Sequence, residues 1–422
     1  MRKIIIVSSM SALALAGAVY AASGGAGGGA GGSFITLPAS AAGGGSPAAT
    51  LNATPAAVDT AVDDSDASLV ADSWICVFKP GLTRAAIRSE AAKAAHAAGG
   101  SLGHVYKVAL QGFSLKARGN AVDAMKAHNP RIDYCTADKV ARIIDPADAG
   151  SDKGPGANKG KPGSGGGSTG QETPWGIARV GGGATYTGSN SAWIIDTGID
   201  LDHPDLNVDT ARSANFVTRE TSPDDLNGHG SHVAGTIGAI DNSEGVVGVA
   251  ANVPVVAVRV LNRRGSGSYS DVIAGIEYVA TNGKSGDVAN MSLGGPADQT
   301  LDYAVINAAS KGIRFALAAG NEADDANNHS PGRANGPNIY TISAIDNTDT
   351  FAYFSNFGNP PVDFAEPGVN IKSTWKNAGY NTISGTSMAT PHAAGLLLWG
   401  NIATDRYASA DPDGNPDPIG HK

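Results

Sequence analysis

The chain has 422 residues, 41% of them hydrophobic, and a formal net charge of −9 at pH 7. This length is sufficient for more than one domain with a sizeable core. The excess of acidic residues argues against nucleic acid or anionic membranes as partners, because both carry negative charge.

The charge is unevenly distributed along the chain. Residues 1–172 carry 16 Lys and Arg against 13 Asp and Glu, whereas residues 173–422 carry 14 against 26. The two parts therefore have opposite net charges, which favours their docking on each other, although salt weakens this attraction.

The N-terminus has the pattern of an export signal. Arg2 and Lys3 precede an apolar run, which ends in small residues. This order predicts a signal peptide over residues 1–22, cleaved after Ala21 or Ala22, and hence secretion to the extracellular space or the periplasm. A membrane anchor is the alternative, but the run is shorter than the roughly 18 apolar residues that an anchor needs.

Two further segments have the composition of linkers. Residues 23–71 are rich in Gly and Ala, and residues 146–171 are rich in Gly and lack apolar periodicity. Neither segment can bury a core, so we expect the first to be disordered and the second to be a flexible linker. They separate an N-terminal unit, residues 72–145, from a larger domain, residues 172–400, which an acidic tail follows at residues 401–422.

The N-terminal unit has a β-α-β-β-α-β pattern. Strands are predicted at S-W-I-C-V-F-K-P, 102–108, 112–118 and 131–136, and helices in the Ala-rich run before Gly99 and at 120–128. This order is typical of a ferredoxin-like α+β fold, in which the first and last strands are neighbours. Cys76 and Cys135 lie in those two strands, so we expect a disulfide in an oxidising compartment, with two buried thiols as the alternative.

The larger domain alternates short apolar runs with helical patterns. The predicted strands are S-A-W-I-I-D, V-P-V-V-A-V-R-V-L, G-D-V-A-N-M-S-L, I-R-F-A-L-A-A-G and I-Y-T-I-S-A-I, and the predicted helices lie near 229–240, 269–282, 298–311 and 387–399. Nearly continuous apolar strands that alternate with helices indicate a parallel sheet covered on both faces. We therefore expect a three-layer α/β/α domain.

Four polar residues stand where such a fold places chemistry. Ser387 begins a helix, whose positive end and backbone N–H suit a nucleophile that generates an oxyanion. His229 begins another helix, and Asp196 and Asn321 each follow or end a buried strand. An Asp that orients a His, which takes the proton of a Ser, is an arrangement that attacks peptide bonds. Taken singly, each residue is better explained as a turn, cap or helix-start residue; the functional interpretation depends on all four occurring together.

The motifs D-T-G, H-G-S-H-V-A-G, A-A-G-N and G-T-S-M-A-T-P-H occur in this order along the larger domain. Together they resemble the subtilisin-like serine proteases (subtilases, the S8 family), and among these the proteinase K-like branch. The resemblance implies that Asp196 orients His229, which acts as general base and then as general acid. Ser387 is then the nucleophile, and Asn321 completes the oxyanion hole. The N-terminal unit resembles the family's inhibitory, fold-assisting propeptide of the inhibitor I9 type.

The same resemblance implies where a substrate binds. An extended peptide is held most simply as an added strand, and the matching segments here are R-G-S-G-S and M-S-L-G-G. The candidate substrate-binding residues are Gly265, Ser266, Gly267, Ser292, Leu293 and Gly294. Turns are the alternative explanation for the glycines. The specificity pocket is expected at 292–295, 318–320 and the loop near His329, without an acidic floor, which predicts a broad preference for apolar or aromatic side chains.

Resemblance to the proteinase K-like branch also implies one structural Ca²⁺ site. Its ligands are the Asp363 carboxylate and the backbone carbonyls of Pro337 and Ile339. The alternative is that Asp363 is an ordinary loop acid, and the usual cysteines of the branch are absent from this domain. No cofactor is expected for the chemistry.

The remaining charged clusters are given structural explanations. His232 and His392 share helices with His229 and Ser387 and are expected to pack or to form hydrogen bonds. The acidic residues of the I-D-L-D-H-P-D-L turn are expected to be solvated charges, with a metal site as the alternative; they are Asp200, Asp202 and Asp205. The tail motif D-P-D-G-N-P-D-P lacks the bidentate Glu of a calcium loop, so we expect a disordered tail.

These observations predict a secreted serine endopeptidase, made as a self-inhibited precursor and matured by its own cleavage at or near the second linker. We expect a monomer that acts on extended peptides. A catalytically latent binding protein with the same fold is the alternative. A lipase or esterase of the α/β-hydrolase type fits poorly, because its G-x-S-x-G nucleophile precedes the Asp and the His.

Overall fold

The computed structural model describes residues 68–143, 170–218 and 220–422. All of these residues fall within one compact part of the chain, Ala57–Lys422, which includes both the N-terminal unit and the larger domain. The predicted signal peptide, nearly all of the Gly/Ala-rich segment and nearly all of the second linker lie outside the described residues.

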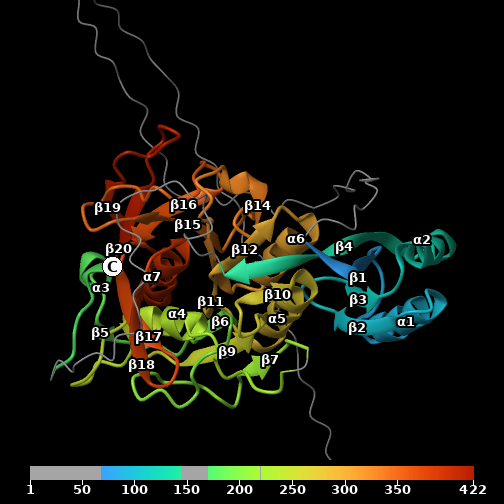
Figure 1. The fold of residues 1–422 in the computed structure, drawn as a ribbon, viewed down its shortest axis with the longest axis horizontal. Coiled ribbons are helices and arrows are strands. Elements are labelled where there is room, and N and C mark those ends of the chain that lie inside the picture. Colours follow the sequence, from blue (N-terminus) through green and yellow to red (C-terminus); the bar gives the residue numbers. More distant parts are fainter. Residues whose placement is uncertain (1–67, 144–169, 219) are drawn as a thin grey trace, which may run out of the picture. The chain divides into compact units, whose positions relative to one another are not determined.

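Within the described residues, a nine-stranded sheet forms the centre of the larger domain (Figure 1). In spatial order its strands are β19 (Ala403–Tyr407), β20 (Pro418–His421), β16 (Val362–Pro367), β15 (Ile339–Ile345), β13 (Arg314–Ala318), β11 (Val288–Met291), β6 (Ala192–Asp196), β9 (Val255–Arg259) and β7 (Ala214–Asn215). Neighbours pair in parallel, except that β19 and β20 are antiparallel. Strands β6, β9 and β11 are buried throughout, as their continuous apolar sequences predict.

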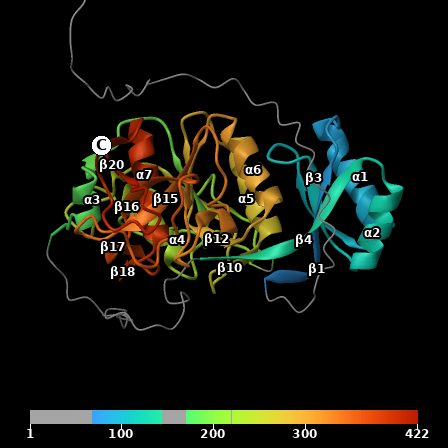
Figure 2. The same ribbon diagram turned by 90° about the horizontal axis from the view of Figure 1, so that it is seen from above.

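Helices cover both faces of this sheet. Helices α4 (His229–Gly238) and α7 (Thr386–Trp399) pack on one face, and α5 (Tyr269–Asn282) and α6 (Gln299–Ala309) pack on the other (Figure 2). Because side chains alternate along a strand, Ile194 and Ile195 of β6 enter the two different cores. The predicted three-layer α/β/α fold is confirmed.

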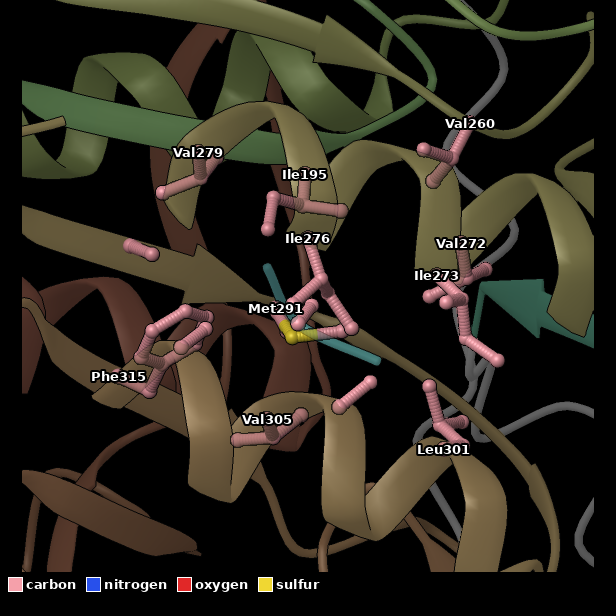
Figure 3. Close-up of a cluster of buried hydrophobic side chains, with 14 of the residues drawn as sticks. Ile195, Val260, Val272, Ile273, Ile276, Val279, Met291, Leu301, Val305 and Phe315 are labelled. Atoms are coloured by element: carbon pink, nitrogen blue, oxygen red, sulfur yellow. The ribbon is translucent and has the colours of Figure 1, made fainter. Parts of the chain in front are cut away.

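Figure 3 shows the core between the sheet and helices α5 and α6. Met291 of β11 stands between Ile276 of α5 and Val305 of α6, and all three side chains are fully buried. Burial of a side chain of this size stabilises a fold by about 1.5–3 kcal/mol, so this core fixes the strand ends that precede the candidate site.

The N-terminal unit follows the predicted β-α-β-β-α-β order. Its elements are β1 (Leu69–Phe78), α1 (Arg84–Ala97), β2 (Ser101–Tyr106), β3 (Gly112–Lys116), α2 (Gly119–His128) and β4 (Ile132–Ile143). The strands pair antiparallel in the spatial order β4-β1-β3-β2. Cys76 and Cys135 face each other across β1 and β4 and form a disulfide, with their Cα atoms 4.0 Å apart.

The acidic tail is ordered, which contradicts the prediction of a disordered segment. Strand β20 pairs with β16, and Ile419 is fully buried in a core of its own with Ala365. The Asp417 carboxylate accepts a hydrogen bond from the Ser343 hydroxyl. These partners lie far from the tail in the sequence, so its polar, proline-rich composition does not reveal them.

The remaining elements are short. They are α3 (Trp175–Arg179), β5 (Ala184–Thr185), β8 (Ala250–Ala251), β10 (Ser266–Ser268), β12 (Leu293–Pro296), the 3₁₀ helix η2 (Ala326–Asn328), β14 (His329–Ser330), β17 (Ile371–Trp375) and β18 (Gly379–Ile383). Among the helices of the described part of the chain, none is long and apolar enough to span a membrane.

Candidate active site

Asp196 and His229 form a buried acid–imidazole pair. Asp196 ends β6 and is fully buried, and His229 is the first residue of α4. The Nδ1 atom of His229 lies 2.9 Å from Oδ1 and 3.0 Å from Oδ2 of Asp196. The backbone N–H of Thr197 donates to Oδ1 of Asp196 at 2.6 Å, which fixes the carboxylate. An imidazole held through Nδ1 has Nε2 on the opposite side of the ring, in position to act as a base.

Ser387 and Asn321 are linked through Thr386. Ser387 is the second residue of α7, and Asn321 follows β13. Oδ1 of Asn321 accepts hydrogen bonds from the backbone N–H and the hydroxyl of Thr386, at 2.8 and 2.9 Å. The Ser387 hydroxyl donates to the Ser292 carbonyl at 3.2 Å. Because α4 packs against α7, the His229 pair and the Ser387 pair belong to the same region of the domain.

The role of Thr386 was not predicted from the sequence. Its only sequence signal is its place directly before Ser387, where threonine also serves as a turn residue. The contact with Asn321 joins positions 65 residues apart in the chain. A pattern of neighbouring residues cannot reveal such a contact.

The other two histidines of these helices are buried and hydrogen-bonded, as predicted. Nε2 of His232 lies 2.9 Å from the Ile371 carbonyl, and Nδ1 of His392 lies 2.9 Å from the Met388 carbonyl. Burial lowers the pKa of His232 to about 3 and the pKa of His392 to about 4. Both rings are therefore neutral near pH 7.

The acidic turn differs from the prediction of solvated charges. Asp200 and Asp205 are 6% and 2% exposed, whereas Asp202 is exposed. Asp200 accepts from the backbone N–H of Ala378, and Asp205 accepts from the side chain of Asn242. The two buried carboxylates therefore anchor neighbouring loops, a function that their polar sequence context conceals.

The predicted substrate-binding segments flank strand β4. Residues 140–142 of β4 pair antiparallel with β10, and residues 142–143 pair with β12 on its other side. Strand β4 is longer than the predicted 131–136 because of these contacts. The Ile143 N–H donates to the Gly265 carbonyl at 2.8 Å. A Cβ at Gly265 would stand 2.6 Å from the Ile143 side chain, so glycine is needed for this approach.

Ser292 connects the same segment to Ser387. Its hydroxyl donates to the Ser387 carbonyl at 2.8 Å, while its carbonyl accepts from the Ser387 hydroxyl. All six predicted substrate-binding residues thus lie in or directly beside β10 and β12, next to strand β4 or Ser387. In this structure the space between these two strands is filled by the end of β4.

Two carboxylates approach His329, the residue expected near the specificity pocket. Nε2 of His329 lies 3.3 Å from the Asp324 carboxylate, and Nδ1 lies 3.7 Å from the Glu322 carboxylate. His329 belongs to β14, which pairs with β12. The sequence-based expectation did not include acidic side chains at this loop.

One predicted calcium ligand, Asp363, contacts the strand that begins at Ile339, another of the three. The Asp363 carboxylate accepts a hydrogen bond from the Thr341 N–H at 2.9 Å, two residues beyond Ile339. Burial raises the pKa of Asp363 to about 6. A half-buried carboxylate beside the first residues of a strand suits a hard cation. Among the described residues, no three His, Cys, Asp or Glu side chains form a metal site, so the remaining ligands would be neutral oxygens.

Comparison with known proteins gives a consistent result. The profile of the subtilase family matches residues 193–399, which include all four predicted catalytic residues. Subtilisin-like protease 2 of Pseudogymnoascus destructans is 37% identical over 354 residues, covering 78% of this chain and 80% of its own. Proteinase R of Parengyodontium album is 34% identical over 351 residues, covering 80% and 81%.

Two further comparisons cover half of this chain or slightly more. Alkaline serine exoprotease A of Vibrio alginolyticus is 47% identical over 215 residues, which is 50% of this chain and 39% of that relative. The crystal structure of a cold-adapted subtilisin-like serine proteinase superposes with a TM-score of 0.51 and 38% sequence identity, covering 58% of this chain and 96% of that one.

Proposed function

Because this chain belongs to the subtilase family of serine endopeptidases, hydrolases that need no cofactor for catalysis, we propose that it is a secreted endopeptidase with an Asp196–His229–Ser387 triad. The observation that carries the proposal is the buried contact of His229 Nδ1 with both oxygens of Asp196. A buried carboxylate in this position sets the imidazole tautomer and stabilises the imidazolium that forms during the reaction.

The reaction follows from these contacts. The Ser387 oxygen attacks the peptide carbonyl carbon, and its proton passes to Nε2 of His229. The carbonyl oxygen becomes an oxyanion, held by the Ser387 N–H and the Asn321 amide. Collapse of this intermediate breaks the C–N bond, and His229 gives its proton to the leaving amine. Water, deprotonated by His229, then hydrolyses the acyl-enzyme. Loss of the Asn321 amide is expected to lower kcat by about 10²–10³-fold.

We propose further that the N-terminal unit inhibits the enzyme before it is removed. The end of β4 pairs with β10 and β12 as an extended substrate would. Upstream, the Glu277 carboxylate of α5 accepts the backbone N–H groups of Lys107, Val108 and Ala109. The buried Asp138 carboxylate accepts from the N–H and the hydroxyl of Ser270. These contacts anchor the unit, so that cleavage beyond β4 leaves a bound inhibitor.

Secretion is supported by the N-terminal sequence and by the disulfide. The Cys76–Cys135 bond is of a kind that persists in oxidising compartments. The acidic catalytic part offers no attraction for anionic membranes. The enzyme would act on extended protein segments as a monomer, with an expected preference for apolar or aromatic residues.

A structural Ca²⁺ ion is proposed at Asp363. The carboxylate is half-buried, its pKa is raised by desolvation, and it lies beside the strand that begins at Ile339. Carbonyl oxygens of Pro337 and Ile339 would complete the ligand set, and the ion would pair with the half-buried charge and tie two strands together.

The test compares the secreted wild-type chain with Ser387→Ala by intact mass, followed by incubation with casein. We expect the wild type to lose its N-terminal part and to digest casein. We expect Ser387→Ala to stay full length and to leave casein intact. If both stay full length and casein survives, the catalytically latent binding protein becomes the better explanation.

A further inference from the structure

Asp225 is a buried carboxylate that bonds both to Thr197, which follows Asp196, and to the backbone around His229. It is 3% exposed and lies four residues before His229. Oδ1 of Asp225 accepts hydrogen bonds from the Thr197 hydroxyl and from the backbone N–H groups of Asn227 and Gly228, at 3.0, 2.9 and 2.8 Å. Oδ2 accepts from the N–H and the hydroxyl of Ser231, at 2.9 and 2.7 Å.

These bonds replace the usual cap of helix α4. The residue before His229 is Gly228, which has a φ of +116°, a conformation that suits glycine. Because glycine has no side chain, this position provides no side-chain cap for the helix. The first turn of a helix has N–H groups without helical partners. Here the Ser231 N–H bonds to Asp225, and the Gly230 N–H bonds to the Thr197 hydroxyl at 2.9 Å.

Thr197 connects Asp225 to Asp196, the acid of the proposed pair. Its hydroxyl has one proton, which it donates to Asp225, so its oxygen lone pairs remain for the Gly230 N–H. Its own N–H donates to the Asp196 carboxylate. Asp225 therefore holds Thr197, the residue after Asp196, and Gly228, the residue before His229, by direct bonds. It holds Gly230, the residue after His229, through the Thr197 hydroxyl.

We infer that Asp225 is a positioning residue for catalysis, which acts through Thr197 and the first turn of α4 to hold His229 against Asp196. This inference rests on the proposed triad and adds to it a residue that touches no substrate. A misplacement of about 1 Å in a catalytic group lowers turnover by about 10²-fold, and we expect a loss of that order in kcat for Asp225→Asn, with KM little changed.

The experiment measures kcat and KM for a peptide anilide with the protein expressed from the full chain. Active sites are counted by saturating labelling with a fluorophosphonate, so that kcat refers to folded enzyme only. Thr197→Val keeps the other bonds of Asp225 and is expected to lower kcat in the same direction. Thr197→Ser restores the hydroxyl and is expected to return kcat to near the wild-type value.

Asp287 provides a matched control. It is fully buried and accepts from the Ser191 N–H, the Trp193 indole and the Lys284 N–H, but it contacts none of the proposed catalytic residues. Asp287→Asn is expected to lower the melting temperature and leave kcat unchanged.

The outcomes separate the inference from the proposed function. If Asp225→Asn and Thr197→Val have the wild-type kcat per labelled active site, Asp225 only stabilises the fold and the inference is wrong. If the wild type itself is neither labelled nor active, the proposed triad fails first. A loss in Thr197→Val that Thr197→Ser rescues supports the inference even where Asp225→Asn does not fold.

Discussion

The backbone N–H and the hydroxyl of Thr386 both donate to the side-chain oxygen of Asn321, at 2.8 and 2.9 Å. A backbone N–H can only donate, so its partner must be Oδ1, and this assigns the orientation of the amide. The Nδ2 group of Asn321 therefore points away from Thr386. In the proposed mechanism this group is one of the two donors of the oxyanion hole, and Thr386, the neighbour of the nucleophile, orients it.

Thr386→Val removes one of these two bonds and keeps the shape of the side chain. The remaining backbone bond still holds Asn321, so we expect kcat to fall by about tenfold, the worth of a single hydrogen bond, with KM nearly unchanged. The measurement is kcat on a peptide anilide. Thr390→Val is the control, since the Thr390 hydroxyl donates to the Thr386 carbonyl in the same helix and not to Asn321. Equal losses in both variants would show that the effect comes from the helix.

The strands and helices of the larger domain were largely predictable from the sequence. Strands β6, β9 and β11 lie in the middle of a parallel sheet, so their sequences are continuous apolar runs. Strand β16 was not predicted, because Asp363 and Glu366 interrupt its apolar pattern. Strand β20 was not predicted either, because it forms by pairing with β16 and is held by the Asp417–Ser343 contact.

The site was likewise predictable only where its residues stand in local sequence motifs. Asp196, His229, Asn321 and Ser387 stand in motifs of small residues, and such motifs can be recognised in a single sequence. Asp225 stands in the polar segment S-P-D-D-L, which looks like a solvated loop. Its burial arises because Thr197 and the first turn of α4 surround it, and this arrangement exists only in the folded chain.

The buried His392 predicts how stability depends on pH. Its pKa is lowered from 6.5 to about 4, so the unfolded chain binds more protons than the native chain between these values. Stability attributable to this residue is present above pH 6.5 and is lost as the pH falls toward 4, with a slope of up to about 1.4 kcal/mol per pH unit.

The test measures the free energy of unfolding by urea between pH 4 and 7 in Ser387→Ala, with and without His392→Gln. The added substitution is expected to reduce the acid-side slope, although it lowers stability at pH 7. Carboxyls with raised pKa, such as Asp417, act in the opposite direction and are common to both proteins. Identical slopes would contradict the assignment.

Removal of the Cys76–Cys135 disulfide is expected to destabilise the N-terminal unit selectively. The bond closes a loop with a sequence separation of 59, for which chain entropy gives about 4 kcal/mol. In the Ser387→Ala full chain, Cys76→Ser with Cys135→Ser should increase hydrogen exchange in β1 and β4 but not in β6 or β11. A reducing agent should reproduce the effect in the parent and have none in the double variant. Unchanged exchange in β1 would argue against the prediction.

Asp363 provides a test of the proposed calcium site. Its raised pKa, about 6, means that stability falls as the pH rises from 3.8 to about 6, where the half-buried carboxyl loses its proton. At pH 8 without metal the charge is partly desolvated, and a bound Ca²⁺ would offset that cost. At 100 times its Kd, calcium should stabilise the Ser387→Ala chain by about 2.7 kcal/mol relative to EDTA.

Asp363→Asn is expected to abolish this response and to be no less stable than the parent in EDTA at pH 8, because it removes the partly desolvated charge. Asp417→Asn is the matched control: desolvation also raises the pKa of Asp417 to about 6, but its carboxylate accepts a hydrogen bond from the Ser343 hydroxyl. This control should retain the calcium response. If Asp363→Asn responds to calcium as strongly as the parent, the ion binds elsewhere, and the raised pKa of Asp363 reflects burial alone.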